Sequence, residues 1–330
     1  MLRVLELFSG IGSQTQALKN IGVQHTTTQC DIDKYAVMAY NQLHGVTPNL
    51  GDISKLSEDS FQEGQWDLIT YSFPCTDISL AGHQEGLAKN SGTRSSLLWE
   101  CEKIFKKVKP KYLVMENVKN LFGKKFFPYF NEWMKVLEGL GYTNYYKILN
   151  AKDFGVPQNR ERAFCVSILG EHKPYVFPQG FKLPVQLKDI LDKNVDDFFY
   201  MDENYMGADK TSGSFRFYNQ AIETLHSNKC KVGDTIDAFN KRVNTTGVCP
   251  TLTTRPEGFK TAILNIVPSR SGNGIEMRKL TPRECWRLMG WKDEQFDKVH
   301  GIPKSHLYKQ AGNSIVIPVL EHLFKNLLLE

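Results

Sequence analysis

A cysteine at the end of a predicted strand is the first candidate for chemistry in this sequence. Cys75 follows Pro74 in the stretch "SFPCTDIS", where an apolar run gives way to polar residues. A thiolate in an exposed loop is a strong nucleophile, whereas many cysteines are small buried hydrophobic residues. The proline and the polar residues indicate an exposed loop, but both interpretations remain open for the residue taken alone.

A carboxylate and two arginines lie near further strand ends. Glu116 interrupts the apolar stretch "VMENV", and a buried charge is unfavourable there unless it has a partner or a chemical role. Arg160 and Arg162 are two residues apart in "QNRER", so an extended backbone would place both side chains on one face. A salt bridge for Glu116 and a solvated edge for the arginines are the simpler alternatives.

The first predicted strands end in residues that suit a nucleoside. Gly10 and Gly12 in "FSGIG" allow the backbone to approach a ligand at the start of a helix. Asp31 can accept hydrogen bonds from both hydroxyls of a ribose, although Asp33 is equally suited to cap the next helix. "GDI" at 51–53 joins an acidic to an apolar residue, as adenine requires. Because the third glycine of a dinucleotide fingerprint is missing, a cofactor without a pyrophosphate fits better than NAD.

These residues need a scaffold, and the hydrophobic pattern predicts one. Short runs rich in Val, Ile, Tyr, Phe and Thr predict strands, and apolar positions three and four apart predict helices between them. The predicted strands are 2–8, 25–32, 66–73, 111–118 and 162–169, and the predicted helices are 13–22, 33–45, 96–109 and 127–141. Buried strands that alternate with helices are typical of a doubly wound α/β sheet, in which ligands bind at the carboxyl ends of the strands.

The second half of the chain has a different character. After about residue 180 the sequence is rich in Gly, Asn and Thr, with short strand-like pieces such as "TAILNIV". This part predicts a smaller, irregular, β-leaning domain. Helical patterns return near the C-terminus, with predicted N-caps at Thr281 and at Asn313 or Ser314.

The composition argues against several classes of protein. The sequence has no run of about 18 apolar residues and no signal-peptide pattern at its N-terminus, which predicts a cytoplasmic protein without a membrane span. The seven cysteines include no C-x-x-C pair and the eight histidines no H-E-x-x-H or H-x-E pattern, so we expect no metal site.

The charge is distributed unevenly in the second half. Residues 181–209 carry three Lys against seven acidic residues, a net charge of −4. Residues 210–280 carry eleven Lys or Arg against five acidic residues, a net charge of +6. The basic block indicates a nucleic-acid surface or an ordinary solvated face.

Taken in order, nine short motifs resemble those of the cytosine-5 DNA methyltransferases. They are "LFSGIGSQ", "DIDKYA", "GDI", "SFPC", "TRSSLLWE", "PKYLVMENV", "FGVPQNRER", "RKLTPRECWRLMGW" and "YKQAGNS". The resemblance covers residues 1 to about 170 and 278–330, and between them only "PTLT" matches. It implies an enzyme of bacterial or phage type with the Rossmann-like α/β fold of S-adenosylmethionine-dependent methyltransferases, and it favours the nucleophilic role of Cys75.

The resemblance also implies a division of the chain. Residues 1–180 would form the catalytic and cofactor-binding domain, 181–280 a target recognition domain across a DNA-binding cleft, 281–305 a hinge, and 306–330 a C-terminal helix that completes the catalytic domain. The positions that match S-adenosylmethionine contacts of the family are Phe8, Gly10, Ile11, Gly12, Asp31, Ile32, Asp52, Ile53, Phe73 and Asn313.

The implied partner is double-stranded DNA, bound by a monomer, with a cognate restriction endonuclease as a genetic partner. Residues 79–96 resemble the mobile catalytic loop of the family, with Ser79 and Arg94 at positions that contact phosphates. The recognition domain offers further candidates for DNA contacts, which are Arg242, Thr253, Thr254, Arg255 and Lys260.

The implied reaction transfers a methyl group from S-adenosylmethionine to carbon 5 of a cytosine that is flipped out of the duplex, leaving S-adenosylhomocysteine. Cys75 would add to carbon 6, and Glu116 would hold nitrogen 3 and the amino group. Arg162 would bind oxygen 2 with Arg160 in support. Thr76 stands where the family commonly has Gln, which puts the details of loop closure in question.

Two other functions compete with this interpretation. A tRNA cytosine-5 methyltransferase shares the fold and the catalytic motifs but has no recognition domain of this size, so residues 181–280 favour DNA. A catalytically silent DNA-binding relative would not need the four intact catalytic candidates, which are Cys75, Glu116, Arg160 and Arg162.

Overall fold

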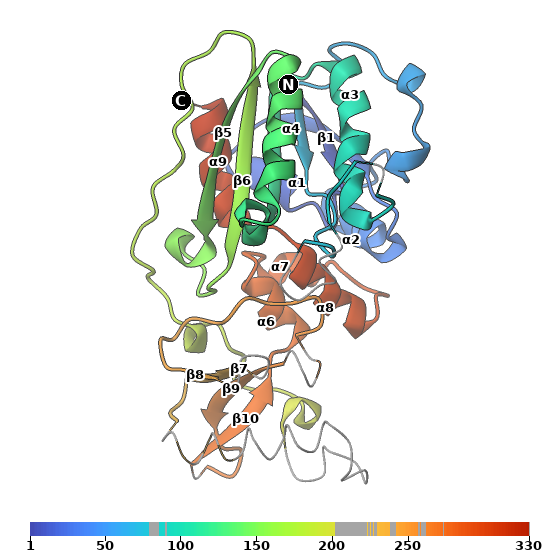
Figure 1. Ribbon diagram of the computed structural model, residues 1–330. Coiled ribbons are helices and arrows are strands. Elements are labelled where there is room, and N and C mark those ends of the chain that lie inside the picture. Colours follow the sequence, from blue (N-terminus) through green and yellow to red (C-terminus); the bar gives the residue numbers. More distant parts are fainter. Residues whose placement is uncertain are drawn as a thin grey trace. The chain divides into compact units, whose positions relative to one another are not determined.

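The computed structural model describes residues 1–78, 86–89, 91–201, 223, 225, 227, 230–237, 242–256, 258, 262–272 and 274–329 (Figure 1). The chain forms two compact units. The first consists of Met1–Asn150, Glu161–Gln179 and Ile317–Glu330, and the second of Ala151–Arg160 and Gly180–Val316. The boundaries of these two units therefore differ from the predicted domain boundaries. The functional role of residues 181–280 stays a prediction.

The first unit is built on a six-stranded sheet with the strand order β2-β1-β3-β4-β6-β5. The strands are β1 (Leu2–Leu7), β2 (His25–Cys30), β3 (Leu68–Tyr71), β4 (Tyr112–Val118), β5 (Tyr142–Asn150) and β6 (Glu161–Leu169). The strands β1 to β4 run parallel, whereas β6 is antiparallel to both β4 and β5. The five predicted strands and the α/β class are confirmed. The edge strand β5 was not predicted, because its sequence "YTNYYKILN" is half polar and half exposed.

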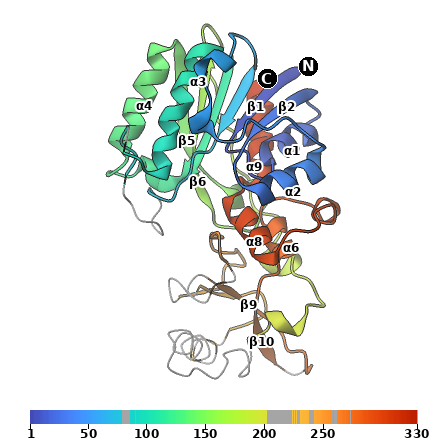
Figure 2. The ribbon, with the colours of Figure 1, turned by 90° about the vertical axis from the view of Figure 1, so that its right-hand side faces the viewer.

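Helices cover both faces of this sheet. They are α1 (Ser13–Asn20), α2 (Lys34–His44), α3 (Glu100–Val108), α4 (Phe127–Gly139) and α9 (Ile317–Leu328). Figure 2 shows α3 and α4 on one face, with α1, α2 and α9 on the other. The C-terminal helix α9 packs against α1, the helix that follows the first strand.

Buried aromatic side chains join α3, α4 and β3. Trp133 of α4 donates its indole N–H to the Tyr71 hydroxyl of β3 (3.1 Å) and packs edge to face against Trp99. Phe105 of α3 packs on both Tyr71 and Trp133. Burial of each large apolar side chain contributes about 1.5–3 kcal/mol, so this core fixes the end of β3, from which the loop with Cys75 starts.

The second unit contains a four-stranded antiparallel sheet with the order β10-β9-β7-β8. The elements of this unit are β7 (Thr235–Asp237), β8 (Arg242–Asn244), β9 (Ile263–Pro268), β10 (Ile275–Lys279), α6 (Pro282–Arg287), α7 (Asp293–Phe296) and α8 (Lys304–Asn313). Its short strands agree with the expected β-leaning character.

Among the helices of the described residues, none is long and apolar enough to cross a membrane.

The two predicted helix caps near the C-terminus have different outcomes. The Thr281 hydroxyl accepts the backbone N–H of Glu284 at the start of α6, as predicted. The cap predicted at Asn313 or Ser314 is wrong. Asn313 is the last residue of α8 and Ser314 caps the C-terminal end of that helix in an extended conformation, so α9 begins only at Ile317.

Candidate active site

The backbone of the loop between β1 and α1 borders open space at one of its two glycines. Gly12 caps α1 with φ 78°, and a Cβ there would lie 2.6 Å from both the Tyr40 ring and the His44 ring. Gly10 also has a positive φ of 55°, yet a Cβ on it would meet nothing within 4 Å. Phe8 has φ 58°, a strained value for a residue with a side chain. The loop is therefore held in an uncommon conformation beside a space that a ligand can enter.

The end of β2 supplies a carboxylate and an exposed apolar side chain next to this loop. Asp31 accepts hydrogen bonds from the backbone N–H groups of Gly10 and Asp33, both at 2.8 Å. Burial raises the pKa of Asp31 above its usual range, and these hydrogen bonds oppose that shift. Ile32 is 75% exposed, which is unusual for isoleucine. Asp33 caps α2, whereas Asp31 binds the backbone of the glycine loop.

The other predicted cofactor residues of the first unit differ in exposure. Asp52 is partly exposed and caps a short 3-10 helix, where hydrogen bonds from the side chain and backbone of Ser54 lower the pKa of Asp52. Ile11, Ile53 and Phe73 are almost wholly buried. Ile32 therefore offers an open apolar surface, whereas Ile53 belongs to the buried core of the first unit.

Cys75 lies in the loop that follows β3. It is partly exposed and in no disulfide, whereas the other six cysteines are buried. The side-chain amide of Asn117 donates to the Phe73 carbonyl (2.9 Å), and that of Asn120 donates to the Ile78 carbonyl (2.6 Å). Both Phe73 and Ile78 are thus attached to the end of β4 and the turn after it.

Among the described residues, no group of three or more His, Cys, Asp or Glu side chains could hold a metal ion.

Glu116 and Arg162 form an ion pair across neighbouring strands. Glu116 lies on β4 and Arg162 on β6, where Arg162 is opposite Val118 in the antiparallel register. The Arg162 Nε and the Glu116 Oε1 are 3.2 Å apart, and both side chains are largely buried. The guanidinium also donates to the Glu161 carbonyl (2.8 Å). The expected partner of Glu116 is therefore Arg162.

The topology gathers these groups at one edge of the sheet. The parallel strands β1, β2, β3 and β4 end there with the glycine loop, Asp31, the loop of Cys75 and Glu116 respectively, and the antiparallel β6 starts there with Arg162. A partly exposed thiol, a buried carboxyl group and a loop with two glycines thus share the carboxyl edge of an open α/β sheet, where ligands of such folds bind.

Arg160 lies directly before the strand of Arg162, and the shared face of the two side chains stays a prediction. The strand β6 begins at Glu161, and Arg160 belongs to the second unit. Its buried guanidinium donates to the carbonyls of Leu252 (3.0 Å), Gly312 (2.7 Å) and Ser314 (3.0 Å). Within the second unit Arg160 thus holds backbone segments on both sides of Asn313, which is a positioning role.

The predicted DNA contacts lie in exposed segments as far as the structure describes them. Arg94 is exposed at the start of the 3-10 helix that precedes α3. In the second unit Arg242, Thr254 and Arg255 are exposed and Thr253 is half-buried. Ser79 and Lys260 lie outside the described residues.

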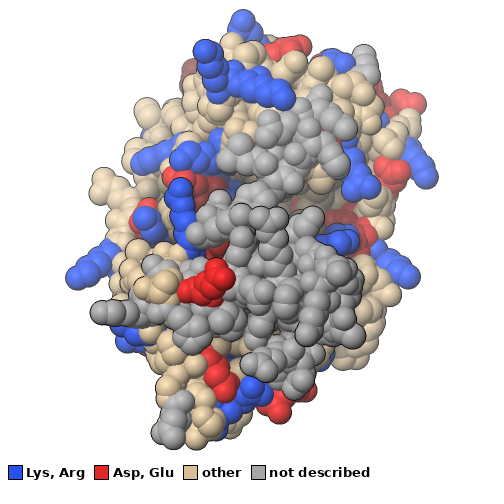
Figure 3. Space-filling view, turned by 60° about the horizontal axis from the view of Figure 1, so that its bottom comes forward, with Lys and Arg blue, Asp and Glu red and all other residues tan. Residues whose placement is uncertain are grey.

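The distribution of charge adds little to these assignments. On the face seen in Figure 3, the described Lys and Arg side chains are dispersed, with acidic side chains among them. The charge of the described residues therefore marks no single DNA-binding patch on that face.

Glu6 is a buried acid that the sequence reasoning overlooked, although it interrupts the apolar run "LRVLELF". It lies on β1, two residues before Phe8, and one carboxylate oxygen accepts a hydrogen bond from the Thr15 hydroxyl (2.7 Å). Burial raises the pKa of the Glu6 carboxyl to about 7. Below about pH 7 the folded protein therefore keeps Glu6 protonated, two residues before the strained Phe8.

This pKa predicts a pH-dependent stability that Glu6→Gln should remove. Below pH 4.5 Glu6 is protonated in both the folded and the unfolded state, so it has no effect on unfolding. Between pH 4.5 and about 7 only the unfolded state ionises, so the free energy of unfolding falls by up to about 3 kcal/mol. Denaturant unfolding should show Glu6→Gln equal to the wild type near pH 4.5 and more stable at pH 8. Equal stability at pH 8 would contradict the assignment.

Residues 2–329 match the profile of the family described as C-5 cytosine-specific DNA methylase. The type II methyltransferase M2.ScrFI of Lactococcus lactis subsp. cremoris is 43% identical over 316 residues, which cover 94% of this chain and 81% of the relative. The type II methyltransferase M.Bsp6I of Bacillus sp. (strain RFL6) is 32% identical over 335 residues, which cover 99% and 98%. The orphan methyltransferase M.SPBetaI of Bacillus phage SPbeta is 30% identical and covers 99% of this chain and 97% of its own.

Solved structures share the fold over nearly the whole chain. The Entamoeba histolytica methyltransferase EhMeth superposes with a TM-score of 0.75 at 19% identity, covering 99% of this chain and 98% of its own. The S. pombe Dnmt2 methyltransferase superposes with a TM-score of 0.72 at 22% identity, covering 100% and 99%. At such identities the likeness concerns the fold alone.

Proposed function

The chain belongs to the C-5 cytosine-specific DNA methylase family, and from this premise we propose that Cys75, Glu116 and Arg162 carry out its reaction. The protein is a sequence-specific DNA (cytosine-5-)-methyltransferase. The observation that carries the assignment of the residues is their position at one sheet edge. The partly exposed Cys75 follows β3, and the neighbouring strands β4 and β6 carry the buried Glu116–Arg162 ion pair.

Carbon 5 of cytosine is a poor nucleophile until a group adds to carbon 6. In the proposed mechanism the Cys75 thiolate forms a bond to carbon 6, which converts the ring into an enamine with charge developing at nitrogen 3. The Glu116 carboxyl group donates a proton at that nitrogen and accepts a hydrogen bond from the amino group. Arg162 orients the Glu116 carboxyl group through its Nε and binds oxygen 2 of the ring.

The methyl group comes from S-adenosylmethionine, which supplies an electrophilic carbon to carbon 5 when bound. The methyl donor leaves as S-adenosylhomocysteine. Carbon 5 then gives its proton to a water molecule, its electron pair forms the bond to carbon 6 and expels the Cys75 thiolate, and nitrogen 3 returns its proton to Glu116. Because the target atoms are inaccessible in a duplex, the cytosine must be flipped out into the site.

The residues at the carboxyl edge fit the adenosine part of this cofactor. The Asp31 carboxylate would accept hydrogen bonds from the ribose hydroxyls, and the exposed Ile32 would cover one face of the adenine. The open space at Gly10 lets the backbone approach the methionine part. Asn313 matches a cofactor position of the family and is proposed as a further contact.

Relatives named type II and orphan methyltransferases support a role in restriction and modification or in phage protection. The proposed setting is the cytoplasm of a bacterial cell, with double-stranded DNA as substrate, a monomeric enzyme, and a cognate endonuclease in the restriction case. In this proposal residues 181–280 read the target sequence, and residues 79–96 close over the flipped base. The tRNA alternative is not favoured, because the relatives that cover this chain are named as type II methyltransferases.

Base-resolution methylation sequencing tests this function. DNA from cells that express the protein should carry 5-methylcytosine at one position of one short sequence, and cells that express Cys75→Ser should lack it. Calorimetry with the purified protein should detect binding of S-adenosylmethionine and not of NAD. Unmethylated DNA together with methylated tRNA would support the RNA alternative, and loss of both marks without cofactor binding would support the silent relative.

A further inference from the structure

We infer that Asp77 and Ser95 are positioning residues that fix the backbone on both sides of Cys75. This inference rests on the proposed role of Cys75 as the nucleophile. Asp77 is 5% exposed and Ser95 is wholly buried, although one is an acid and the other a hydroxyl. Buried polar groups of this kind are kept only where their hydrogen bonds are satisfied and serve a purpose.

The two residues bind each other and the loop in a closed pattern of hydrogen bonds. The Asp77 Oδ2 accepts the backbone N–H of Ser95 at 2.9 Å, and the Ser95 Oγ accepts the backbone N–H of Asp77 at 3.3 Å. The Ser95 hydroxyl donates a hydrogen bond to the Pro74 carbonyl, with an O–O distance of 2.7 Å. Since Pro74 precedes Cys75 and Asp77 follows it by two residues, these bonds bracket the nucleophile.

Thr76 takes part in the same set of hydrogen bonds. Its side-chain hydroxyl donates to the Asp77 Oδ2 at 3.3 Å, while the residue itself is exposed. The family commonly has Gln at this position, so a residue that could position the loop is replaced here by a shorter one. In this chain the Asp77 carboxylate connects Thr76 to the buried Ser95.

The anchor of these hydrogen bonds, Ser95, lies at the C-terminal end of residues 79–96, where helical structure begins. Ser95 lies in the first turn of the 3-10 helix Arg94–Trp99, which continues directly into α3. The N-terminus of that helix is capped by Thr93, whose hydroxyl accepts the backbone N–H of Ser96. The Asp77 carboxylate thus accepts one of the backbone N–H groups that a helix start leaves without a partner inside the helix. The direction of the Cys75 side chain depends on this connection, and a displacement of about 1 Å lowers reactivity on the order of 100-fold.

The test uses duplex DNA with 5-fluorocytosine at the target position. Fluorine on carbon 5 cannot leave as a proton does, so the bond between Cys75 and carbon 6 persists after methyl transfer and the complex survives denaturation. Asp77→Ala and Ser95→Ala should slow the formation of this complex about 100-fold, with affinities for S-adenosylmethionine and DNA changed less than about threefold. Asp77→Asn keeps an oxygen that can accept both hydrogen bonds, and it should retain the rate within about fivefold.

Ser57→Ala is the matched control, because the Ser57 hydroxyl caps another 3-10 helix of the first unit, Glu58–Ser60, and accepts the backbone N–H of Asp59. It should form the complex at the wild-type rate. The inference is overturned if Asp77→Ala and Ser95→Ala also react at that rate, or if they lose cofactor binding in parallel with reactivity, as a purely structural defect would require. A wild-type protein that forms no trapped complex would overturn the role of Cys75 and this inference together.

Discussion

Cys75→Ser is expected to abolish methylation, with a loss of about 10⁴-fold or more, because a serine hydroxyl is a far weaker nucleophile than a thiolate at neutral pH. The wild type should form a denaturation-resistant complex with duplex DNA that carries 5-fluorocytosine, and only when S-adenosylmethionine is present. The variant should form none while DNA binding remains nearly unchanged. Cys75 is the cysteine best placed for this role, since the other six are buried.

A second cysteine variant serves as the control for this experiment. Cys230 lies in the second unit, where burial raises the pKa of its thiol, so that thiol is less able to ionise. Cys230→Ser should therefore form the trapped complex as the wild type does. A complex that persists in Cys75→Ser would show that the nucleophile lies elsewhere.

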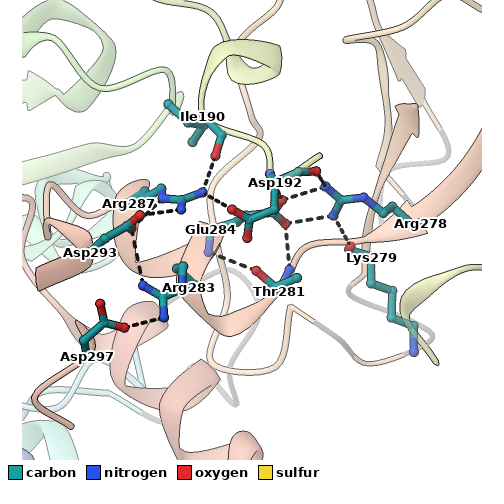
Figure 4. A network of polar contacts seen from close by, with 10 residues as sticks. All are labelled: Ile190, Asp192, Arg278, Lys279, Thr281, Arg283, Glu284, Arg287, Asp293 and Asp297. Carbon is teal, nitrogen blue, oxygen red and sulfur yellow. Dashed lines mark hydrogen bonds and ion pairs between the residues drawn. The ribbon is translucent and has the colours of Figure 1, made fainter. Parts of the chain in front are cut away.

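Glu284→Ala is expected to lower the free energy of unfolding by about 3–5 kcal/mol, because it leaves a buried guanidinium without its counterion. Arg278 and Glu284 are 1% and 0% exposed, and two hydrogen bonds of 2.8 Å and 2.6 Å join them. Glu284 also accepts the backbone N–H groups of Thr281 (2.8 Å) and Asp192 (2.7 Å). Figure 4 shows this carboxylate at the centre of contacts from β10, α6 and the segment around Asp192.

Urea unfolding at pH 7 measures the effect. The control is Arg283→Ala, since the ion pairs of Arg283 with Asp293 and Asp297 are partly exposed and should contribute less than about 1 kcal/mol. The double variant Arg278→Met with Glu284→Leu should be more stable than Glu284→Ala, because it leaves no unpaired buried charge. If Glu284→Ala unfolds at the same urea concentration as Arg283→Ala, the central role of this ion pair is refuted.

The sequence by itself determined five of the six strands of the first unit and the order of its chemical groups. Apolar runs with helices between them predicted β1 to β4 and β6, because burial on both faces of a sheet requires continuous apolar sequence. The residues that follow those runs, such as Cys75 and Asp31, could then be assigned to one sheet edge, since the carboxyl ends of parallel strands meet there. Glu116 was recognised because it is a charged residue within an apolar strand.

The tertiary structure decided what depends on contacts between distant residues. The antiparallel direction of β6 places Arg162 beside Glu116, and packing within the second unit surrounds the Arg160 guanidinium with three backbone carbonyls. No local pattern encodes either result, because strand direction and strand ends are set by packing and by hydrogen bonds to other strands.

The same holds for the residues that position the nucleophile. The side chains of these residues bind backbone groups, as Asp77, Ser95 and Asn117 do. Since nearly all residues have the same backbone groups, the partners cannot be recognised from the sequence. Ile53 and Ile32 are equally apolar in the sequence, yet the fold buries the first and exposes the second. Hydrophobic pattern thus predicts which segments are buried, while the choice of which single side chain faces a ligand is made only when the strands and loops have packed together.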